Sequence, residues 1–175
     1  MDVVDAVRNR RSVRSYQDRS VPPEKLERIL EAARMAPSAS NKQDWRFVVV
    51  IENRAKDRIY EVAKKQRFIK EAPVVVAGVT TDPGYIMTCG VPSGYVDVSI
   101  ALDHISLLAT EEGLGTCWIG AFDQEEVCSI LEIPDDYEVV ALMTLGYPEK
   151  PLESISKSRK SLQDVVDYEV FGGSR

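Results

Sequence analysis

The feature that most constrains the fold is a set of four short apolar runs separated by segments of helical periodicity. The runs read RFVVVI at 46–51, PVVVAGVT at 73–80, GTCWIG at 115–120 and YEVVALMTLG at 137–146. The first two are dominated by β-branched residues, which favour strands. Strands that are apolar throughout, mixed with helices along the whole chain, predict a helix-covered sheet in one α+β or α/β layer architecture.

Between the runs, apolar residues recur at helical spacing. The predicted helices are 2–9, a helix that starts at SVPPE (20–24) and ends at Ala36, 54–66, 94–112 and Asp123–Leu131. Asp123 is suited to be an N-cap and Gly113 a helix-ending residue. The helix 94–112 is apolar nearly all round, which is typical of a helix central to the core or buried at an interface. A chain of 175 residues has little room for such a helix, so we expect a dimer.

We expect a single domain over 1–175, because the length lies within the usual range for one domain. The tail after Tyr147 is polar, with sparse apolar residues. It either stays mobile or packs on another surface, and we expect residues from about 150 onward to pack on a partner subunit.

Composition excludes several classes of function. The chain carries 22 Lys and Arg against 28 Asp and Glu, a net charge of −6, so we expect neither nucleic-acid binding nor an anionic membrane surface as partner. The most apolar stretch, 96–110, is too short and too polar to span a bilayer. A single histidine, His104, excludes HExxH metalloproteases and three-histidine zinc sites.

The cysteines point the same way. Cys89, Cys117 and Cys128 are odd in number and form no CxxC pair, so we predict neither a disulfide framework nor a metal site. Free thiols fit a cytoplasmic location. We interpret His104 as structural, and Cys89 as a reactive thiol only in an electropositive setting.

Positive charge is concentrated at two places far apart in the sequence. Arg8, Arg10, Arg11 and Arg14 lie within seven residues, and SKSRKSL (156–162) carries the second group. Guanidinium groups match phosphate oxygens, so the two groups could converge on one phosphate. The alternative is that each is a solvated surface patch.

Two further segments have the composition of a binding site. PSASNKQDW (37–45) offers donors and acceptors suited to the edge of a heterocycle, although core packing is the favoured interpretation of Trp45. Gly120 and Ala121 would let a flat ligand approach the backbone. Neither a GxGxxG nor a GxxxxGK[ST] fingerprint is present.

Several motifs in one order give the chain a family resemblance. They are RRSVRSY (10–16), APSASNKQDWRFVVV (36–50), EAPVVVAG (71–78), EEGLGTCWIGAF (111–122), LGYP (145–148) and SKSRKSL (156–162). This set resembles the nitroreductase family of FMN-dependent NAD(P)H oxidoreductases, in a short-chain form. The resemblance implies an α+β fold, with a central, mostly antiparallel sheet between helices in three layers, and an intertwined homodimer.

The resemblance also implies the residues that bind FMN. They are Arg10, Arg11, Ser12 and Arg14 from the first motif, Pro37, Ser38, Ala39, Ser40 and Asn41 from the second, Gln66 (or Lys65 instead), Gly120 and Ala121, and the basic pair Lys157 and Arg159. The loop Pro37–Asn41 is implied to reach the flavin from the partner subunit.

The mechanism implied by the resemblance needs no catalytic side chain, because the flavin carries the hydride chemistry. NADH or NADPH would reduce the flavin, and a small organic acceptor such as a nitroaromatic or a quinone would reoxidise it in a ping-pong scheme. Arg14 is the candidate for tuning the flavin, and Thr81–Tyr95 for facing the substrate. Two alternatives stay open: a flavin-binding or flavin-processing protein without NAD(P)H turnover, and a plain anion-binding scaffold.

Overall fold

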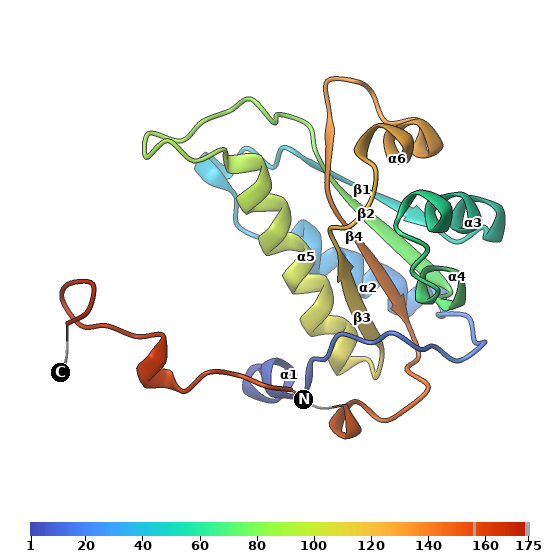
Figure 1. Cartoon of the computed structure of the whole chain (residues 1–175), viewed down its shortest axis with the longest axis horizontal. Helices are drawn as coiled ribbons and strands as arrows, with labels where there is room; N and C mark the ends of the chain where they lie inside the picture. Colours follow the sequence, from blue (N-terminus) through green and yellow to red (C-terminus); the bar gives the residue numbers. More distant parts are fainter. Residues whose placement is uncertain (156, 174–175) are drawn as a thin grey trace.

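A four-stranded antiparallel sheet forms the centre of the protein, of which a computed structural model describes residues 1–155 and 157–173. Its strands are β1 (Trp45–Val50), β2 (Val74–Thr80), β3 (Gly115–Ile119) and β4 (Glu138–Gly146). Each lies within a residue of a predicted run. The order β1-β2-β4-β3 leaves β1 and β3 at the edges, as Figure 1 shows.

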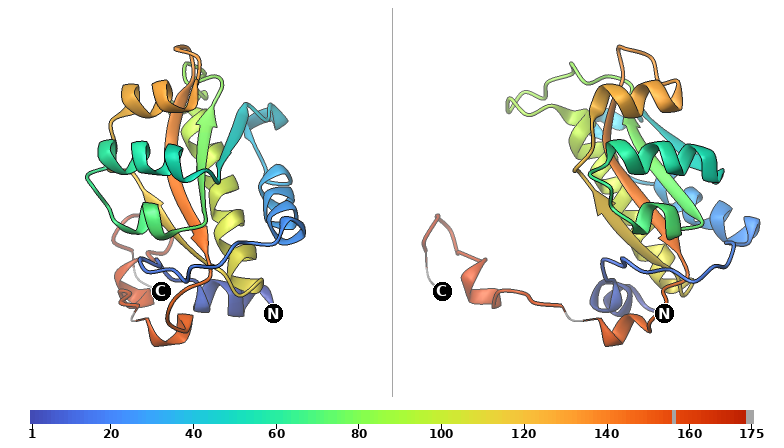
Figure 2. Two further views of the ribbon diagram at one scale, coloured as in Figure 1. Left: turned by 90° about the vertical axis from the view of Figure 1, so that its right-hand side faces the viewer. Right: turned by 45° about the vertical axis from the view of Figure 1, so that its right-hand side comes forward.

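Helices cover both faces of this sheet, which confirms the predicted three layers (Figure 2). One face carries α2 (Pro23–Arg34) and α5 (Ser93–Glu111), with α1 (Val3–Asn9) against the end of α5. The other face carries α3 (Asn53–Val62), α4 (Phe68–Glu71) and α6 (Gln124–Leu131). Short 3-10 turns lie at η1 (Ala39–Asn41), η2 (Leu152–Ser154) and η3 (Leu162–Asp164).

The predicted helix ends hold at two places and fail at one. Asp123 caps α6 by accepting the Glu126 N–H at 3.0 Å, and Gly113 follows α5 with φ +76°. The helix predicted over 54–66 ends at Val62 instead, because Lys64 and Lys65 adopt left-handed backbone (φ 54° and 53°). The short α4 after this turn was not predicted.

Two glycines let α5 lie close to the sheet. A Cβ on Gly78 of β2 would lie 2.8 Å from atoms of Val98 and Leu102, and a Cβ on Gly94 would lie 2.1 Å from the Thr80 hydroxyl. Substitution at either glycine would therefore push α5 away from β2. This close packing fixes where the first turns of α5 lie relative to the loops that follow β2.

The helix predicted to be apolar all round has one side that this chain leaves open. Val98, Leu102 and Ile105 are fully buried, whereas Tyr95 and Val96 are each 38% exposed. Burial of the open side at an interface stays a prediction. Among the described residues, no helix combines the length and the apolar character needed to cross a bilayer.

The C-terminal segment leaves the body of the molecule beyond Lys157 (Figures 1 and 2). Its apolar side chains are exposed, and Phe171 is fully so. They are Leu162, Val165, Val166, Tyr168, Val170 and Phe171. Packing of this tail on a partner subunit, and the single-domain division, remain predictions.

Candidate functional site

The N-terminal basic segment is held along the start of β3. Ser12 forms a parallel bridge with Thr116, and the Val13 N–H donates to the Thr116 carbonyl at 2.9 Å. Val13 is buried, and a Cβ on Gly115 would lie 2.3 Å from its side chain. The glycine in β3 therefore makes room for the segment, while Arg14 stays exposed.

A buried polar network lies beneath this segment. The Tyr16 hydroxyl donates to the Val13 carbonyl at 3.0 Å and is hydrogen-bonded to the Thr144 hydroxyl at 2.8 Å. The Thr144 hydroxyl also lies 3.4 Å from the Cys117 carbonyl, to which it can donate instead of to Tyr16. Burial raises the pKa of Tyr16 far above its ordinary value, so the phenol stays protonated and keeps donating its bond.

The two basic groups, 150 residues apart in sequence, lie side by side. Lys157 donates to the Val7 carbonyl at 2.7 Å, at the C-terminal end of α1, and Arg11 donates to the Ile155 carbonyl at 2.7 Å. Arg11 also donates to the Arg8 carbonyl at 2.5 Å. The two groups are therefore close neighbours, although Arg11 uses much of its guanidinium to join the two segments. Their convergence on one phosphate stays a prediction.

Positive charge in this cluster is uncompensated. Burial, followed by the neighbouring Arg10, Arg11 and Arg159, lowers the pKa of Lys157. Within the described part of the chain, no carboxylate forms an ion pair with Arg10, Arg11, Arg14, Lys157 or Arg159. Like charges held close together repel one another, and a multivalent anion such as a phosphate relieves that repulsion.

The far end of β3 is open beside Gly120. Gly120 is exposed, and a Cβ built on it would meet no atom within 4 Å. The Gln66 amide donates to the Ala63 carbonyl at 3.0 Å and to the Ala121 carbonyl at 3.4 Å. Gly120 lies about 13 Å along the strand from Thr116, at about 3.3 Å per residue. The site thus has a cationic end and an end without side chains.

Cys117 of β3 lies between these two ends and is buried. Burial raises the pKa of its thiol, although the nearby Arg14 and Arg10 act in the opposite direction. A buried thiol whose pKa is raised is not an activated nucleophile. Because both arginines act on this thiol, their charge lies close to β3.

The predicted loop Pro37–Asn41 does not lie beside the basic cluster. Its Ala39 N–H is bound by Asp97, in the second turn of α5, whereas the chain's N-terminal amine pairs with Glu111, the last residue of α5, at 3.3 Å. Asp97 and Glu111 are about 21 Å apart along the helix axis, at about 1.5 Å per residue. Figure 1 shows η1 and α1 at opposite ends of α5.

This loop has an unusual backbone. Ser40, Asn41 and Gln43 all have positive φ, at 52°, 55° and 57°. Left-handed backbone costs about 1–3 kcal/mol for a residue other than glycine and is found most often at functional sites. The Ser38 hydroxyl supports the turn by accepting the Gln43 N–H at 3.0 Å.

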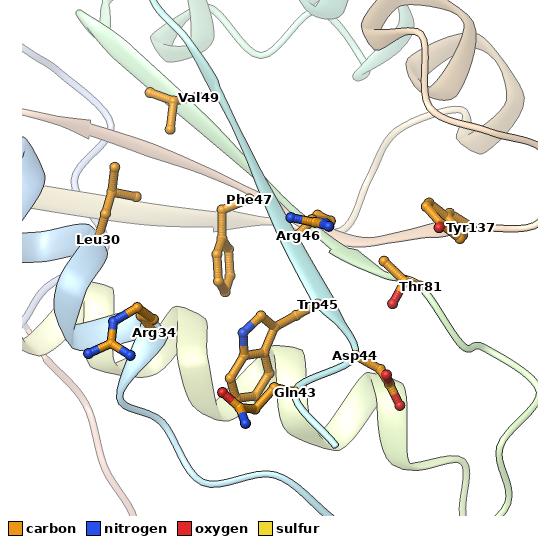
Figure 3. Close-up of a pocket in the computed structure, with 10 residues that line it drawn as sticks. All are labelled: Leu30, Arg34, Gln43, Asp44, Trp45, Arg46, Phe47, Val49, Thr81 and Tyr137. Atoms are coloured by element: carbon orange, nitrogen blue, oxygen red, sulfur yellow. The ribbon is translucent and has the colours of Figure 1, made fainter. Parts of the chain in front are cut away.

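A groove of about 640 Å³ runs along the free edge of β1. In Figure 3, Trp45 and Phe47 project from one side of the strand toward Leu30 and Arg34 of α2. Trp45 is half-buried: it packs against the core on the face of α2 and α5, as was favoured, and it also lines this groove. Of the predicted cofactor-binding residues, none lines the groove.

Three other features singled out in the sequence are His104, Cys89 and the metal-ligating residue types. His104 Nδ1 lies 3.2 Å from the Ala32 carbonyl, which suits a structural histidine. Cys89 is exposed. In the described ranges, no group of His, Cys, Asp or Glu is arranged to hold a metal ion.

Tyr16, Lys42 and Asp97 are the residues of this region that sequence reasoning missed. Tyr16 lies inside the RRSVRSY motif, but its partner Thr144 is 128 residues away. Lys42 and Asp97 carried no signal in the sequence, because their partners Asp82 and Ala39 lie 40 and 58 residues away.

Comparison with known proteins gives the family. The model of the nitroreductase family matches residues 7–83 and 61–147. An NADH dehydrogenase of Thermus thermophilus is 32% identical over 197 residues, covering 95% of each chain. The FMN reductase [NAD(P)H] of Bacillus subtilis is 30% identical over 185 residues, covering 96% of this chain and 73% of the relative.

A solved structure agrees with these matches. The crystal structure of a nitroreductase family protein from Clostridium difficile superposes with a TM-score of 0.86 at 32% identity, covering 98% of this chain and all of the other. The family model and the relatives both span most of the chain. The chain therefore belongs to the nitroreductase family.

Proposed function

We propose that the protein is an FMN-dependent oxidoreductase that takes electrons from NADH or NADPH and passes them to a small organic acceptor. The observation that carries the proposal is the uncompensated basic cluster beside β3, next to the exposed Gly120. A cationic end followed by a side-chain-free surface suits an elongated ligand with a phosphate and a flat ring. The names of the relatives from Thermus thermophilus and Bacillus subtilis support the same chemistry.

The residues present fit FMN in the following way. Arg10, Lys157 and Arg159 would bind the phosphate, and Ser12 would donate its hydroxyl beside them. Arg11 would mainly hold the two chain segments together, since its hydrogen bonds go to backbone carbonyls.

The ring would lie against the end of β3. Gly120 and Ala121 would leave room for it, and Gln66, already held against Ala121, would orient its polar edge. Arg14 is exposed beside β3, where its charge would stabilise the negative charge of a reduced ring and so raise its reduction potential.

When bound, FMN supplies the hydride and electron transfer, so the protein needs no acid–base pair of its own. The chain's own residues bind the cofactor, orient it and exclude competing groups from one face. NAD(P)H and the acceptor would then use the same open face in turn, in a ping-pong scheme. We propose that Thr81–Tyr95 faces the acceptor.

We further propose that the working unit is a homodimer. A single chain holds the loop Pro37–Asn41 about 21 Å, at about 1.5 Å per residue along α5, from the end where the basic cluster lies. A second copy would bring its own loop to this cluster. The exposed apolar side chains of α1 (Val3, Val4 and Val7), together with Val96, fit such an interface.

The C-terminal tail would pack on the other subunit. The free edge of β1 has unpaired backbone groups and a groove lined by apolar side chains such as Trp45 and Phe47 together with Arg34 and Arg46. The tail has exposed apolar residues and the acidic residues Asp164, Asp167 and Glu169, which complement this groove. Light scattering should give twice the 19.6 kDa mass of one chain.

The experiment that tests the function starts from the colour of the purified protein. We expect a yellow protein whose flavin is bleached by NADH or NADPH and recoloured by a quinone or a nitroaromatic. Steady-state kinetics with a panel of acceptors and both nicotinamides would then identify the preferred substrates. Colourless protein that ignores added FMN would contradict the proposal, and bound FMN without NAD(P)H turnover would indicate a flavin-binding protein instead.

A matched pair of variants locates the cofactor. We expect Arg10→Ala combined with Arg14→Ala to strip most of the FMN. The control replaces two exposed arginines outside the site, Arg54→Ala and Arg58→Ala on α3, and should leave the FMN content unchanged. Equal FMN content in both double variants would mean that the basic cluster is only a solvated patch.

A further inference from the structure

Asp97 is a buried carboxylate to which neither the fold nor the proposed chemistry gives a role. It lies in α5 and is only 5% exposed. Within the described ranges it forms no ion pair with a lysine or arginine. Burying a carboxylate without a counter-ion is costly, so the partners that it does have are informative.

Among the described residues, the hydrogen-bond partner of this carboxylate is a single backbone group. Both Asp97 oxygens lie 3.1 Å from the backbone nitrogen of Ala39, whose N–H they accept. Ala39 is the first residue of η1, in the loop Ser38–Asn41. A hydrogen bond to an ionised acceptor is stronger than one between neutral groups. Asp97 therefore ties this loop to the part of α5 that packs most closely on the sheet.

The loop needs such a tie, because its backbone is strained. Ser40, Asn41 and Gln43 all have left-handed φ values, a conformation that persists only where the surroundings enforce it. On its outer side, Lys42 is bound to Asp82 at 2.9 Å and lies 3.6 Å from the ring centroid of Tyr85. Lys42 thus holds the loop to exposed neighbours, whereas Asp97 holds it to the core.

We propose that Asp97 is a positioning residue that sets the loop Ser38–Asn41 in its flavin-contacting conformation before the flavin binds. This inference rests on the proposed function, because the flavin is the ligand that the loop would contact. A loop that is already ordered does not have to be ordered on binding, so affinity is gained without a new contact. Without the tie, only a fraction of molecules would hold the loop correctly, and the apparent affinity would fall by that fraction.

The test compares two substitutions at Asp97 in the full chain. Apo-protein is titrated with FMN, and binding is followed by the change in flavin fluorescence. Asp97→Ala removes the acceptor, and we expect the affinity for FMN to fall about 10-fold or more, the scale of one charge-assisted hydrogen bond. Asp97→Asn keeps an oxygen that accepts the Ala39 N–H, and we expect its affinity to stay within about 3-fold of the parent protein.

Two controls separate this role from a general loss of structure. Glu125→Ala removes an exposed carboxylate from α6, in the opposite layer, and should leave FMN affinity unchanged. Hydrogen exchange at the Ala39 amide should quicken in Asp97→Ala and stay slow in Asp97→Asn, with or without FMN. Light scattering checks that each variant keeps the oligomeric state of the parent.

The outcomes are distinct. Tight FMN binding by Asp97→Ala, or equal losses in Asp97→Ala and Asp97→Asn, would overturn the inference while leaving the proposed function intact. The second result, with exchange at the Ala39 amide still slow in Asp97→Asn, would mean that the charge acts on the flavin, and not through the loop. A parent protein that binds no FMN would overturn the proposed function and this inference together.

Discussion

The hydroxyl of Tyr16 offers the sharpest test of how the basic segment is held. Tyr16→Phe keeps the ring in the core but removes its hydrogen bonds to the Val13 carbonyl (3.0 Å) and to the Thr144 hydroxyl (2.8 Å). Thr144 keeps only the longer bond to the Cys117 carbonyl, at 3.4 Å. Each lost bond contributes about 0.5–1.5 kcal/mol. We therefore expect the free energy of unfolding to fall by about 1–3 kcal/mol.

Denaturant titration of the apo-protein measures this loss. The midpoint should fall while the slope stays unchanged, because the surface exposed on unfolding is the same. A loss of about 2 kcal/mol corresponds to a lower melting temperature by roughly 4–8 °C for a chain of this size. Tyr85→Phe is the control, since the Tyr85 hydroxyl makes no hydrogen bond within the described residues.

The pH dependence gives an independent check. Burial raises the pKa of Tyr16 in the folded protein. Above about pH 10 the tyrosine loses its proton in the unfolded chain but keeps it in the folded protein, so the free energy of unfolding falls as the pH rises. The parent protein should lose up to about 1.4 kcal/mol per pH unit more than Tyr16→Phe above that pH. If Tyr16→Phe changes the free energy of unfolding at pH 7 by less than about 0.5 kcal/mol, the level of an ordinary surface substitution, the reasoning is refuted.

Two further predictions address the cofactor surface and the helix cap. Gly120→Val should leave the melting temperature of the apo-protein unchanged, because a Cβ there meets no atom within 4 Å. It should nevertheless weaken FMN binding at least about 10-fold, because the side chain fills the space for the ring. Unchanged FMN affinity in a fluorescence titration would place the ring elsewhere. Asp123→Ala should lower the free energy of unfolding by about 1 kcal/mol, since α6 loses the bond to the Glu126 N–H. Asp123→Asn, which keeps the cap, should retain most of that stability in the same denaturant titration.

Local sequence was sufficient to predict most helices and strands. The apolar runs form β1 to β4. A strand such as Val74–Thr80 has side chains on both faces that need burial, and only a sheet covered by helices on both sides buries them. Prediction from local sequence failed where the backbone leaves the usual φ/ψ regions. Lys64 and Lys65 adopt left-handed φ and end α3 early. Lysine does not indicate such a turn, as glycine would.

The candidate site divides in the same way. The residues of the basic cluster, Gly120 and the loop Pro37–Asn41 were all named from motifs, because phosphate-binding and turn residues have a recognisable chemistry. Their grouping was not predictable. Lys157 meets Val7 across 150 residues of sequence, and Gln66 meets Ala121 across 55. The loop was assigned to a partner subunit only by resemblance, and that assignment stays a prediction.

The amino-acid sequence by itself thus determined the helix-covered sheet, the surplus of acidic charge and the two places where positive charge is concentrated, since these follow from residue type and short-range periodicity. Only the tertiary structure decided which groups meet. Tyr16 finds Thr144, and Asp97 finds Ala39, across 128 and 58 residues. Such pairs depend on strand order and on the close approach of α5 to β2. Both are properties of packing that no local pattern encodes.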